Sequence, residues 1–299
     1  EARWYALGDV VASQGGSAVE PSHLKSYDVD SCIVEIYDQT ETQMEDVALI
    51  RRLLTYLPLP LPERGGRIGE GGSSILEPFC GNGRILIPLA QDGHRLVGLD
   101  KSPPMLASAR AKLAALPPEV RERVTLRQVD VLAAPWPQGF DLVVLGGNCL
   151  YELATPEEQE ACIGAAATSL RPGGYLYLDN NHMEGELAAS WREPGVNVNR
   201  FPTGRCADGT VVQGTTETIA FDAQTRLVRI RRRVTITRPD GTTTQREWVE
   251  QKHPPSTAEM RAWLARHGFE VEGLWGDRQG APYTDASGRA IFWAQRAGG

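Results

Sequence analysis

The chain has 299 residues, which is enough for one large core with an elaboration or for two modest domains. Hydrophobic residues make up 41% of it and charged residues 23%, which is ordinary globular usage and argues against extended disorder. The formal net charge of −7 disfavours nucleic acid and anionic membranes as partners, and no apolar run reaches the roughly 18–20 residues of a membrane helix. A small-molecule partner fits these figures better.

The cysteines and the first residues bear on the cellular compartment. The sequence begins without the basic and then apolar layout of a secretory signal. The cysteines are odd in number, widely scattered and never spaced C-x-x-C, which fits neither a disulfide framework nor a zinc site. We therefore expect a cytoplasmic protein without a bound metal, in which all of the following are reduced thiols: Cys32, Cys80, Cys149, Cys162 and Cys206.

The first clear periodicity begins after residue 40. Thr42-x-x-Glu45 has the form of a capping box, and apolar residues then recur at helical spacing up to Leu57. This pattern predicts an amphipathic helix that covers another part of the fold. Residues 58–74 are so rich in proline and glycine that we expect a linker there. We assign residues 1–66 to an N-terminal helical cap.

Short apolar runs then alternate with helical patterns. Strands are expected at 75–76, 95–99, 124–126, 140–145 and 175–178, and helices at 84–92, 104–116 and 155–170. Strands and helices that alternate in this way predict parallel strands joined by right-handed crossovers. A ligand should lie outside the carboxyl ends of the strands. We assign residues 67–183 to this core.

The pattern changes after residue 183. Residues 210–251 alternate with period two around turn signals at Asp222-Ala223 and Pro239-Asp240-Gly241, which predicts an antiparallel meander inserted over 184–255. Residues 256–299 return to the core with a helix at 257–267 and strands at 269–275 and 290–294. The predicted fold is α/β, a Rossmann-like open and mostly parallel sheet with a helical cap and an antiparallel insertion. Such an insertion can pair across a two-fold axis, so a homodimer is possible.

The first predicted βα unit carries a glycine loop, Glu77-Pro78-Phe79-Cys80-Gly81-Asn82-Gly83, and the second strand ends at Asp100. Glycines let the backbone approach a ligand, and a carboxylate in the position of Asp100 can accept hydrogen bonds from a ribose diol. A dinucleotide site would need a third glycine, but Leu86 stands there. A carboxylate at Glu77 also repels phosphates, so a phosphate-free, cationic nucleoside fits better.

Over roughly residues 74–182 the chain resembles class I S-adenosylmethionine (SAM)-dependent methyltransferases. ILEPFCGNGRILIPLA is similar to their motif I, with Phe79 in place of the first glycine, and LVGLDKSPPMLASAR, VDVLAAPWP, FDLVVLGGNCLYEL and LRPGGYLYLD match later motifs in order. The resemblance implies SAM as the cofactor. It implies the following cofactor-binding residues: Glu77, Phe79, Cys80, Gly81, Gly83, Arg84, Asp100, Lys101, Asp130, Val131, Gly146 and Asn148.

The N-terminal Tyr-Asp pairs and the antiparallel insertion resemble small-molecule methyltransferases, including sugar and amine N-methyltransferases. This resemblance implies methyl transfer from SAM to an oxygen or nitrogen of a small metabolite. One alternative is a protein or nucleic-acid acceptor, against which stands Gly146-Gly147-Asn148-Cys149, where enzymes that methylate nucleic-acid amino groups carry N/D-P-P-Y/F. The other is a non-catalytic SAM-binding module, favoured only by Phe79.

Residues at the predicted carboxyl edge are the candidates for contact with the acceptor. His182 follows the fifth strand, where a neutral imidazole suits removal of a proton, although it is equally consistent with a surface loop histidine. Tyr27 and Tyr37 either close over the cofactor or pack within the cap. Tyr151 and Asn181 are tentative substrate residues, and Tyr151 alternatively caps the turn that follows the fourth strand.

Overall fold

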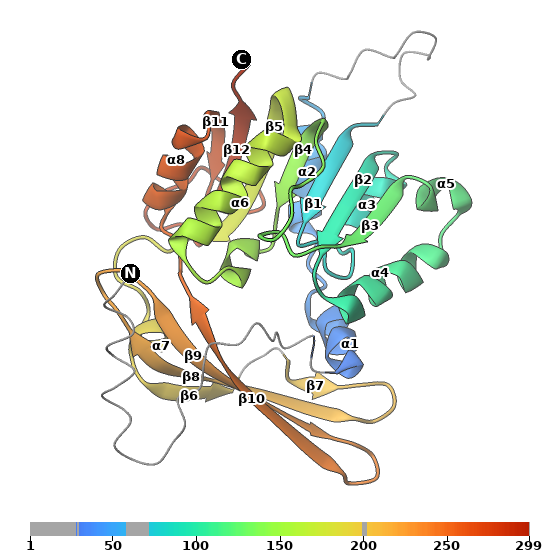
Figure 1. The fold of residues 1–299 in the computed structure, drawn as a ribbon, viewed down its shortest axis with the longest axis vertical. Coiled ribbons are helices and arrows are strands. Elements are labelled where there is room, and N and C mark those ends of the chain that lie inside the picture. Colours follow the sequence, from blue (N-terminus) through green and yellow to red (C-terminus); the bar gives the residue numbers. More distant parts are fainter. Residues whose placement is uncertain (1–27, 29, 58–71, 199–201, 299) are drawn as a thin grey trace.

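The computed structural model describes residues 28, 30–57, 72–198 and 202–298. Its larger sheet has seven strands in the order β11-β12-β5-β4-β1-β2-β3 (Figure 1). Its five parallel strands are β1 (Ser74–Pro78), β2 (Arg95–Asp100), β3 (Val124–Gln128), β4 (Phe140–Leu145) and β5 (Leu170–Asn181). At the far edge β12 (Arg289–Arg296) runs antiparallel to β5, and β11 (Phe269–Trp275) runs antiparallel to β12. The expected open, mostly parallel α/β sheet is confirmed.

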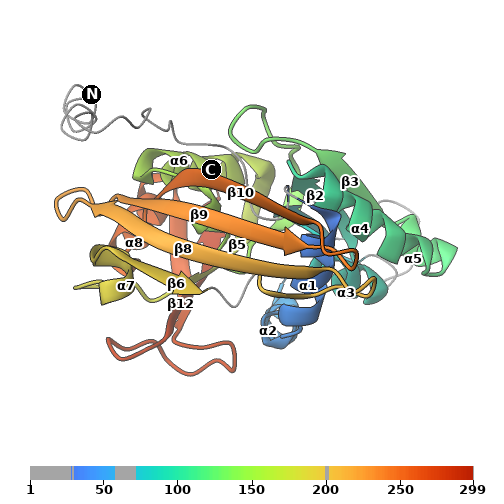
Figure 2. The ribbon, with the colours of Figure 1, turned by 90° about the horizontal axis from the view of Figure 1, so that it is seen from below.

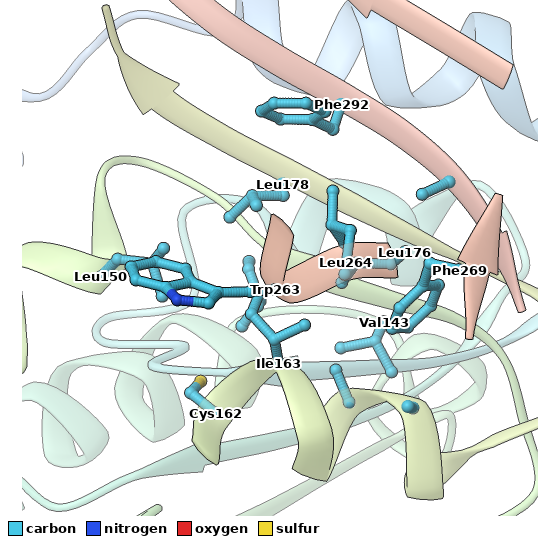
Figure 3. Packing of buried hydrophobic residues seen from close by; sticks show 14 of the residues in the cluster. Val143, Leu150, Cys162, Ile163, Leu176, Leu178, Trp263, Leu264, Phe269 and Phe292 are labelled. Carbon is cyan, nitrogen blue, oxygen red and sulfur yellow. The ribbon is translucent and has the colours of Figure 1, made fainter. Parts of the chain in front are cut away.

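Helices cover both faces of this sheet, which explains why β4 is buried along its whole length. On one face α6 (Pro156–Ser169) and α8 (Thr257–Arg266) pack through Ile163, Trp263 and Leu264 against Leu176 and Leu178 of β5 (Figure 3). The other face is covered by α2 (Glu45–Leu54), α3 (Leu86–Gln91), α4 (Pro103–Ala114) and the short α5 (Pro118–Arg121). Burial of these two apolar layers is the main stabilising term of the core.

Local capping signals set where the core helices begin. Ser102 caps α4 and Thr155 caps α6, each with its side-chain oxygen accepting a backbone N–H of the first turn. Helix α8 begins with a full capping box between Ser256 and Glu259. These helices lie close to the predicted ranges because their start signals are local in sequence.

The N-terminal part differs from the sequence prediction. Helix α1 (Ser31–Thr40), capped by Asp30, was not expected, and the proposed capping box at Thr42 is wrong because α2 has Met44 at its N-cap without a side-chain cap. The acidic first turn of α2 instead includes Asp46, which is fully buried against Arg84. A tertiary ion pair therefore takes the place of the local cap. Most of the expected linker, 58–71, lies outside the described residues.

The inserted sheet lies across the carboxyl ends of the core strands (Figures 1 and 2). Its strand order is β10-β9-β8-β6. These strands are β6 (Gly195–Val198), β8 (Val211–Phe221), β9 (Val228–Thr237) and β10 (Thr243–Lys252). The short β7 (Gly204–Arg205) pairs with β8, and the short helix α7 (Ala189–Arg192) precedes the sheet. The three long strands match the predicted meander, whereas the short β6 and β7 were not predicted. The domain boundaries given above stay a prediction.

Helix α1 links the inserted sheet to the core. Ile33 and Ile36 pack with Val212, Val234 and Trp248 in a separate apolar cluster. Figure 1 shows α1 between α4 and β7. The helix is thereby placed beside the glycine loop.

A disulfide joins α1 to the inserted sheet and corrects the expectation that every cysteine is a thiol. Cys32 and Cys206 are bonded, with their Cα atoms 5.9 Å apart and 174 positions between them in sequence. Pairing over such a distance depends on the tertiary fold, so spacing could not reveal it. The other three cysteines are free and buried.

Opening this disulfide should lower stability, because a cross-link over a long loop restricts the unfolded chain. We expect Cys32→Ser to lower the free energy of unfolding by about 2–5 kcal/mol in denaturant titrations under oxidising conditions. In excess dithiothreitol the variant and the native protein should converge. An equal difference under both conditions would show that the loss comes from packing and not from the bond.

None of the helices in the described ranges combines the length and apolar character needed to cross a bilayer.

Candidate active site

A cavity of about 460 Å³ opens at the carboxyl ends of β1, β2 and β4, between the core, α1 and β10. It brings together residues that the sequence places far apart, as expected where parallel strands end at a common edge. The following predicted residues line it: Tyr37, Glu77, Phe79, Cys80, Gly81, Arg84, Asp100, Lys101, Asp130, Val131, Gly146 and Asn148.

Four other predicted residues do not line this cavity. Gly83 lies one turn behind the lining, and its N–H donates to the Cys80 carbonyl oxygen at 2.9 Å. Tyr151 packs edge-on against Trp191, and Asn181 ends β5. His182 is also outside the lining. Tyr27 lies outside the described residues.

The glycine loop keeps its turn although Phe79 replaces the first glycine. Phe79 has φ 65°, and Gly81 and Gly83 have φ 51° and 80°. All three therefore adopt the left-handed region that favours glycine, and Phe79 is strained there. The Phe79 ring packs against the core cluster that includes Leu76 and Leu99, which offsets part of that strain.

Asp100 fixes the loop to the end of β2. Its Oδ2 accepts the Gly81 N–H at 2.8 Å, and its Oδ1 accepts the Ser102 N–H at 2.8 Å. Burial raises the pKa of this carboxyl, while the two N–H donors oppose the rise. The remaining lone pairs of the carboxylate are available to a ligand with two hydroxyls.

The surroundings of the Glu77 carboxyl indicate whether a cationic ligand fits the cavity. Its Oε2 is buried and has no hydrogen-bond partner among the described residues. Burial raises the pKa of Glu77 well above its usual value, and nearby Arg84 only partly opposes the rise. A buried carboxylate with one oxygen unpartnered is costly, so a cation placed over that oxygen is favoured. The sulfonium and amino group of SAM meet this requirement.

SAM binding should therefore release a proton from Glu77. The raised pKa lets Glu77 hold its proton to a higher pH in the free protein, and a bound cation lowers that pKa, so affinity rises with pH between the two values. Calorimetry in buffers of different ionisation enthalpy should show release of up to about one proton per SAM bound. Glu77→Gln should bind more weakly and release none. Equal proton release by both proteins would contradict this assignment.

Two ion pairs hold the glycine loop against the N-terminal cap. Asp38 of α1 accepts from the Asn82 side chain at 2.5 Å and pairs with Lys112 of α4 at 2.5 Å. Arg84 donates to both carboxylate oxygens of Asp46, at 2.9 and 2.5 Å. No local pattern predicts these contacts, because each joins residues more than 30 positions apart.

The lining of the cavity also includes four glutamates outside the glycine loop, which we call the acidic wall and define as Glu41, Glu152, Glu158 and Glu250. Glu41 follows α1, Glu152 ends the short η3 helix (Cys149–Glu152), Glu158 lies in α6 and Glu250 in β10. The two cations that line the cavity within the described ranges, Arg84 and Lys101, follow β1 and β2 instead. Sequence analysis missed this wall because its members come from four separate elements.

Tyr37 lies beside the acidic wall. Burial raises the pKa of its phenol to about 12; nearby Arg84 lowers it, and Glu41 and Glu152 add to the rise. The phenol therefore stays protonated at neutral pH. Cys80 is equally inert as a nucleophile, because burial raises the pKa of its thiol well above the usual value.

His182 lies at the end of β5 but points away from this lining. Its Nδ1 is 2.8 Å from the hydroxyl of Tyr283, which in turn donates to Thr257 Oγ1 at 3.1 Å. These contacts tie the end of β5 to α8. A role for His182 as a base stays a prediction.

Comparisons with known proteins agree with this geometry. Residues 75–174 match the family model of a methyltransferase domain. The cypemycin N-terminal methyltransferase of a Streptomyces species is 26% identical over 270 residues, which cover 89% of this chain and 97% of that protein.

Two solved structures share the fold. The CcbJ methyltransferase of Streptomyces caelestis superposes with a TM-score of 0.66 at 19% identity, over 89% of this chain and 96% of that one. The sugar N-methyltransferase of Streptoalloteichus sp ATCC 53650 gives 0.63 at 21% identity, over 95% and 98%. With the matched domain, the glycine loop and the carboxylates at Glu77 and Asp100 in one cavity, the protein is a SAM-dependent methyltransferase of the class I fold.

Proposed function

We propose that this enzyme moves the methyl group of SAM to a small metabolite, and that the acceptor atom is an amine nitrogen in preference to a hydroxyl oxygen. In this proposal Asp100 binds the ribose, Asp130 and Val131 bind the adenine, and Glu77, Arg84 and Gly146 surround the methionine end. These assignments rest on the lining of the cavity and on the motif pattern.

The acidic wall is the observation that carries the choice of an amine. Four carboxylates face this part of the cavity, and the described lining residues from α1, η3, α6 and β10 include no lysine or arginine. Such a surface attracts an ammonium group and repels an anionic acceptor. Glu250 is paired with Arg232 and Lys252, and Glu158 accepts the Ala154 N–H at 2.6 Å, so the charge of these two carboxylates is partly offset.

Methyl transfer needs a neutral amine whose lone pair points at the methyl carbon. Bound SAM supplies that methyl group on a sulfonium, from which it leaves by in-line displacement. A carboxylate of the acidic wall can hold the incoming ammonium and take its proton, while protonated Tyr37 can donate a hydrogen bond. A hydroxyl acceptor would need a stronger base, because its pKa is far above that of an ammonium.

The names of two relatives that match over most of the chain support nitrogen as the target, whereas relatives that match over 121 residues are ubiquinone biosynthesis O-methyltransferases. The full-length match is an N-terminal methyltransferase, and one structural neighbour is a sugar N-methyltransferase. A peptide with a free N-terminus is therefore included in the test as the macromolecular alternative.

The test uses SAM labelled in its methyl group and matched acceptors. Cyclohexylamine, cyclohexanol, a tripeptide with a free N-terminus and its N-acetylated form are incubated with enzyme, and labelled products are identified by mass spectrometry. We expect labelled cyclohexylamine and no labelled alcohol.

Glu152→Gln should raise KM for the amine about tenfold, whereas Glu157→Gln, on the exposed side of α6, should not change it. Methylation of the alcohol alone would overturn the proposal.

We also propose a cytoplasmic location, although the Cys32–Cys206 disulfide removes the support that reduced cysteines would give it. A homodimer formed through an edge of the inserted sheet stays possible, and sedimentation equilibrium would test it.

A further inference from the structure

Arg289, the first residue of β12, has all three guanidinium nitrogens occupied at the end of β5. Its Nε donates to Asp179 Oδ1 at 2.6 Å, its Nη1 to Asn181 Oδ1 at 2.8 Å, and its Nη2 to Asn148 Oδ1 at 3.0 Å. Asp179 is fully buried and also accepts from Arg278 at 2.9 Å. A buried carboxylate between two guanidinium groups is a rigid anchor. The position of Arg289 is therefore fixed by its contacts.

These contacts also fix Asn148, which lines the cavity. Asn148 has φ 63°, its N–H donates to the Asp179 carbonyl oxygen at 3.1 Å, and its Oδ1 accepts the Asn181 N–H at 2.8 Å besides Arg289. Both lone pairs of Oδ1 are therefore used, and both donors demand an oxygen at that position. The Nδ2 group makes no hydrogen bond to any described residue. It can therefore donate to a ligand in the cavity that Asn148 lines.

Asn148 and one member of the acidic wall, Glu152, belong to the same short helix. Asn148 is the N-cap of η3, and Glu152 is the last residue of that helix. One helical turn thus presents an amide donor and a carboxylate to the same cavity. An acceptor that satisfies both groups carries an ammonium for Glu152 and a nearby oxygen for Asn148.

We propose that Arg289 is a positioning residue for methyl transfer, which holds Asn148 so that Nδ2 donates to an oxygen vicinal to the reacting amine. The acceptor class is then an amine with a neighbouring hydroxyl or carbonyl oxygen, and this inference rests on the proposed amine methylation. Arg289 acts through Asn148 and does not touch the acceptor itself.

The kinetic test compares trans-2-aminocyclohexanol with cyclohexylamine, using labelled SAM. We expect the native enzyme to prefer the amino alcohol in kcat/KM by about tenfold, the size of one added hydrogen bond. Arg289→Lys and Asn148→Ser should each remove the preference. The single nitrogen of a lysine cannot span the three acceptors that the planar guanidinium reaches, and a serine lacks the amide donor. The double variant should be no worse than either single variant, as expected for residues that act in one chain of contacts.

Arg278→Lys is the matched control, because Arg278 contacts the same buried carboxylate but forms no hydrogen bond with Asn148 among the described residues. It should keep the preference for the amino alcohol. The affinity for S-adenosylhomocysteine should stay within about twofold in all single variants, since the proposed contact is to the acceptor. Loss of the preference in Arg278→Lys, or a tenfold loss of S-adenosylhomocysteine affinity in Asn148→Ser, would overturn the proposal.

A spectroscopic arm separates this inference from the proposed function. In protein labelled with 15N-asparagine, the Asn148 side-chain amide should give a sharp pair of signals that broadens in Arg289→Lys and stays sharp in Arg278→Lys. If neither amine is methylated, the proposed function fails while this readout still decides whether Arg289 fixes Asn148. An unchanged Asn148 signal in Arg289→Lys would refute the positioning role. A tripeptide with a free N-terminus, used as a further substrate, tests acceptors whose neighbouring oxygen is a carbonyl.

Discussion

Replacing Asp100 by alanine is expected to weaken SAM binding about 100-fold, because hydrogen bonds to a charged group contribute about 1.5–3 kcal/mol. The carboxylate has two tasks. It accepts the N–H groups of Gly81 and Ser102, and its remaining lone pairs face the cavity, where we propose that the ribose diol binds. Alanine removes both the ligand contact and the anchor of the glycine loop. Calorimetric titration with SAM measures the change.

Two variants separate these tasks. Asp100→Asn keeps one oxygen acceptor and should fall between alanine and the native protein. Asp130→Ala tests a carboxylate that lines the same cavity but is exposed, with its Oδ1 accepting the Leu132 N–H at 3.0 Å; its loss should cost at most about tenfold. If Asp100→Ala binds SAM within threefold of the native protein, the ribose does not rest on this residue.

Much of the core could be predicted because its signals are local. The period of the apolar residues and the glycine loop each act within a few positions. The apolar run located β4 at the same residues that the structure shows, 140–145. The replacement of a glycine by Phe79 did not mislead the prediction, because the turn is kept at φ 65°. The SAM cofactor was likewise predicted from local motifs.

The acceptor side could not be predicted in the same way. Asn148 depends on Arg289, which is 141 positions away, and the Cys32–Cys206 bond spans 174 positions. Such contacts depend on which elements the folded chain brings together, and the sequence carries no local mark of them. His182 was predicted from its place after the fifth strand. In the structure its imidazole contacts Tyr283, and it does not line the cavity.

Replacing Asp46 by alanine is expected to lower the free energy of unfolding by about 3–5 kcal/mol, the usual cost of leaving a buried charge without its partner. Asp46 is fully buried, pairs with Arg84 at 2.5 Å and lies 3.6 Å from Arg278. Without it the partly buried Arg84 would lose its carboxylate partner, and Arg278 would keep only Asp179. Urea denaturation at pH 7 measures the loss, and Asp46→Asn serves if the alanine variant does not fold.

The Arg51–Asp92 pair is the matched control, with an N–O distance of 2.6 Å but side chains that are 47% and 32% exposed. Asp92→Ala should cost less than about 1 kcal/mol.

The loss in Asp46→Ala should also depend on pH. Burial alone would raise the pKa of Asp46, but Arg84 and Arg278 lower it below its usual value. The stability that Asp46 contributes is therefore complete above the unfolded pKa of about 3.9 and disappears as the pH falls through the lower folded value. A loss as small as that of Asp92→Ala at pH 7 would show that this buried pair does not stabilise the cap on the glycine loop.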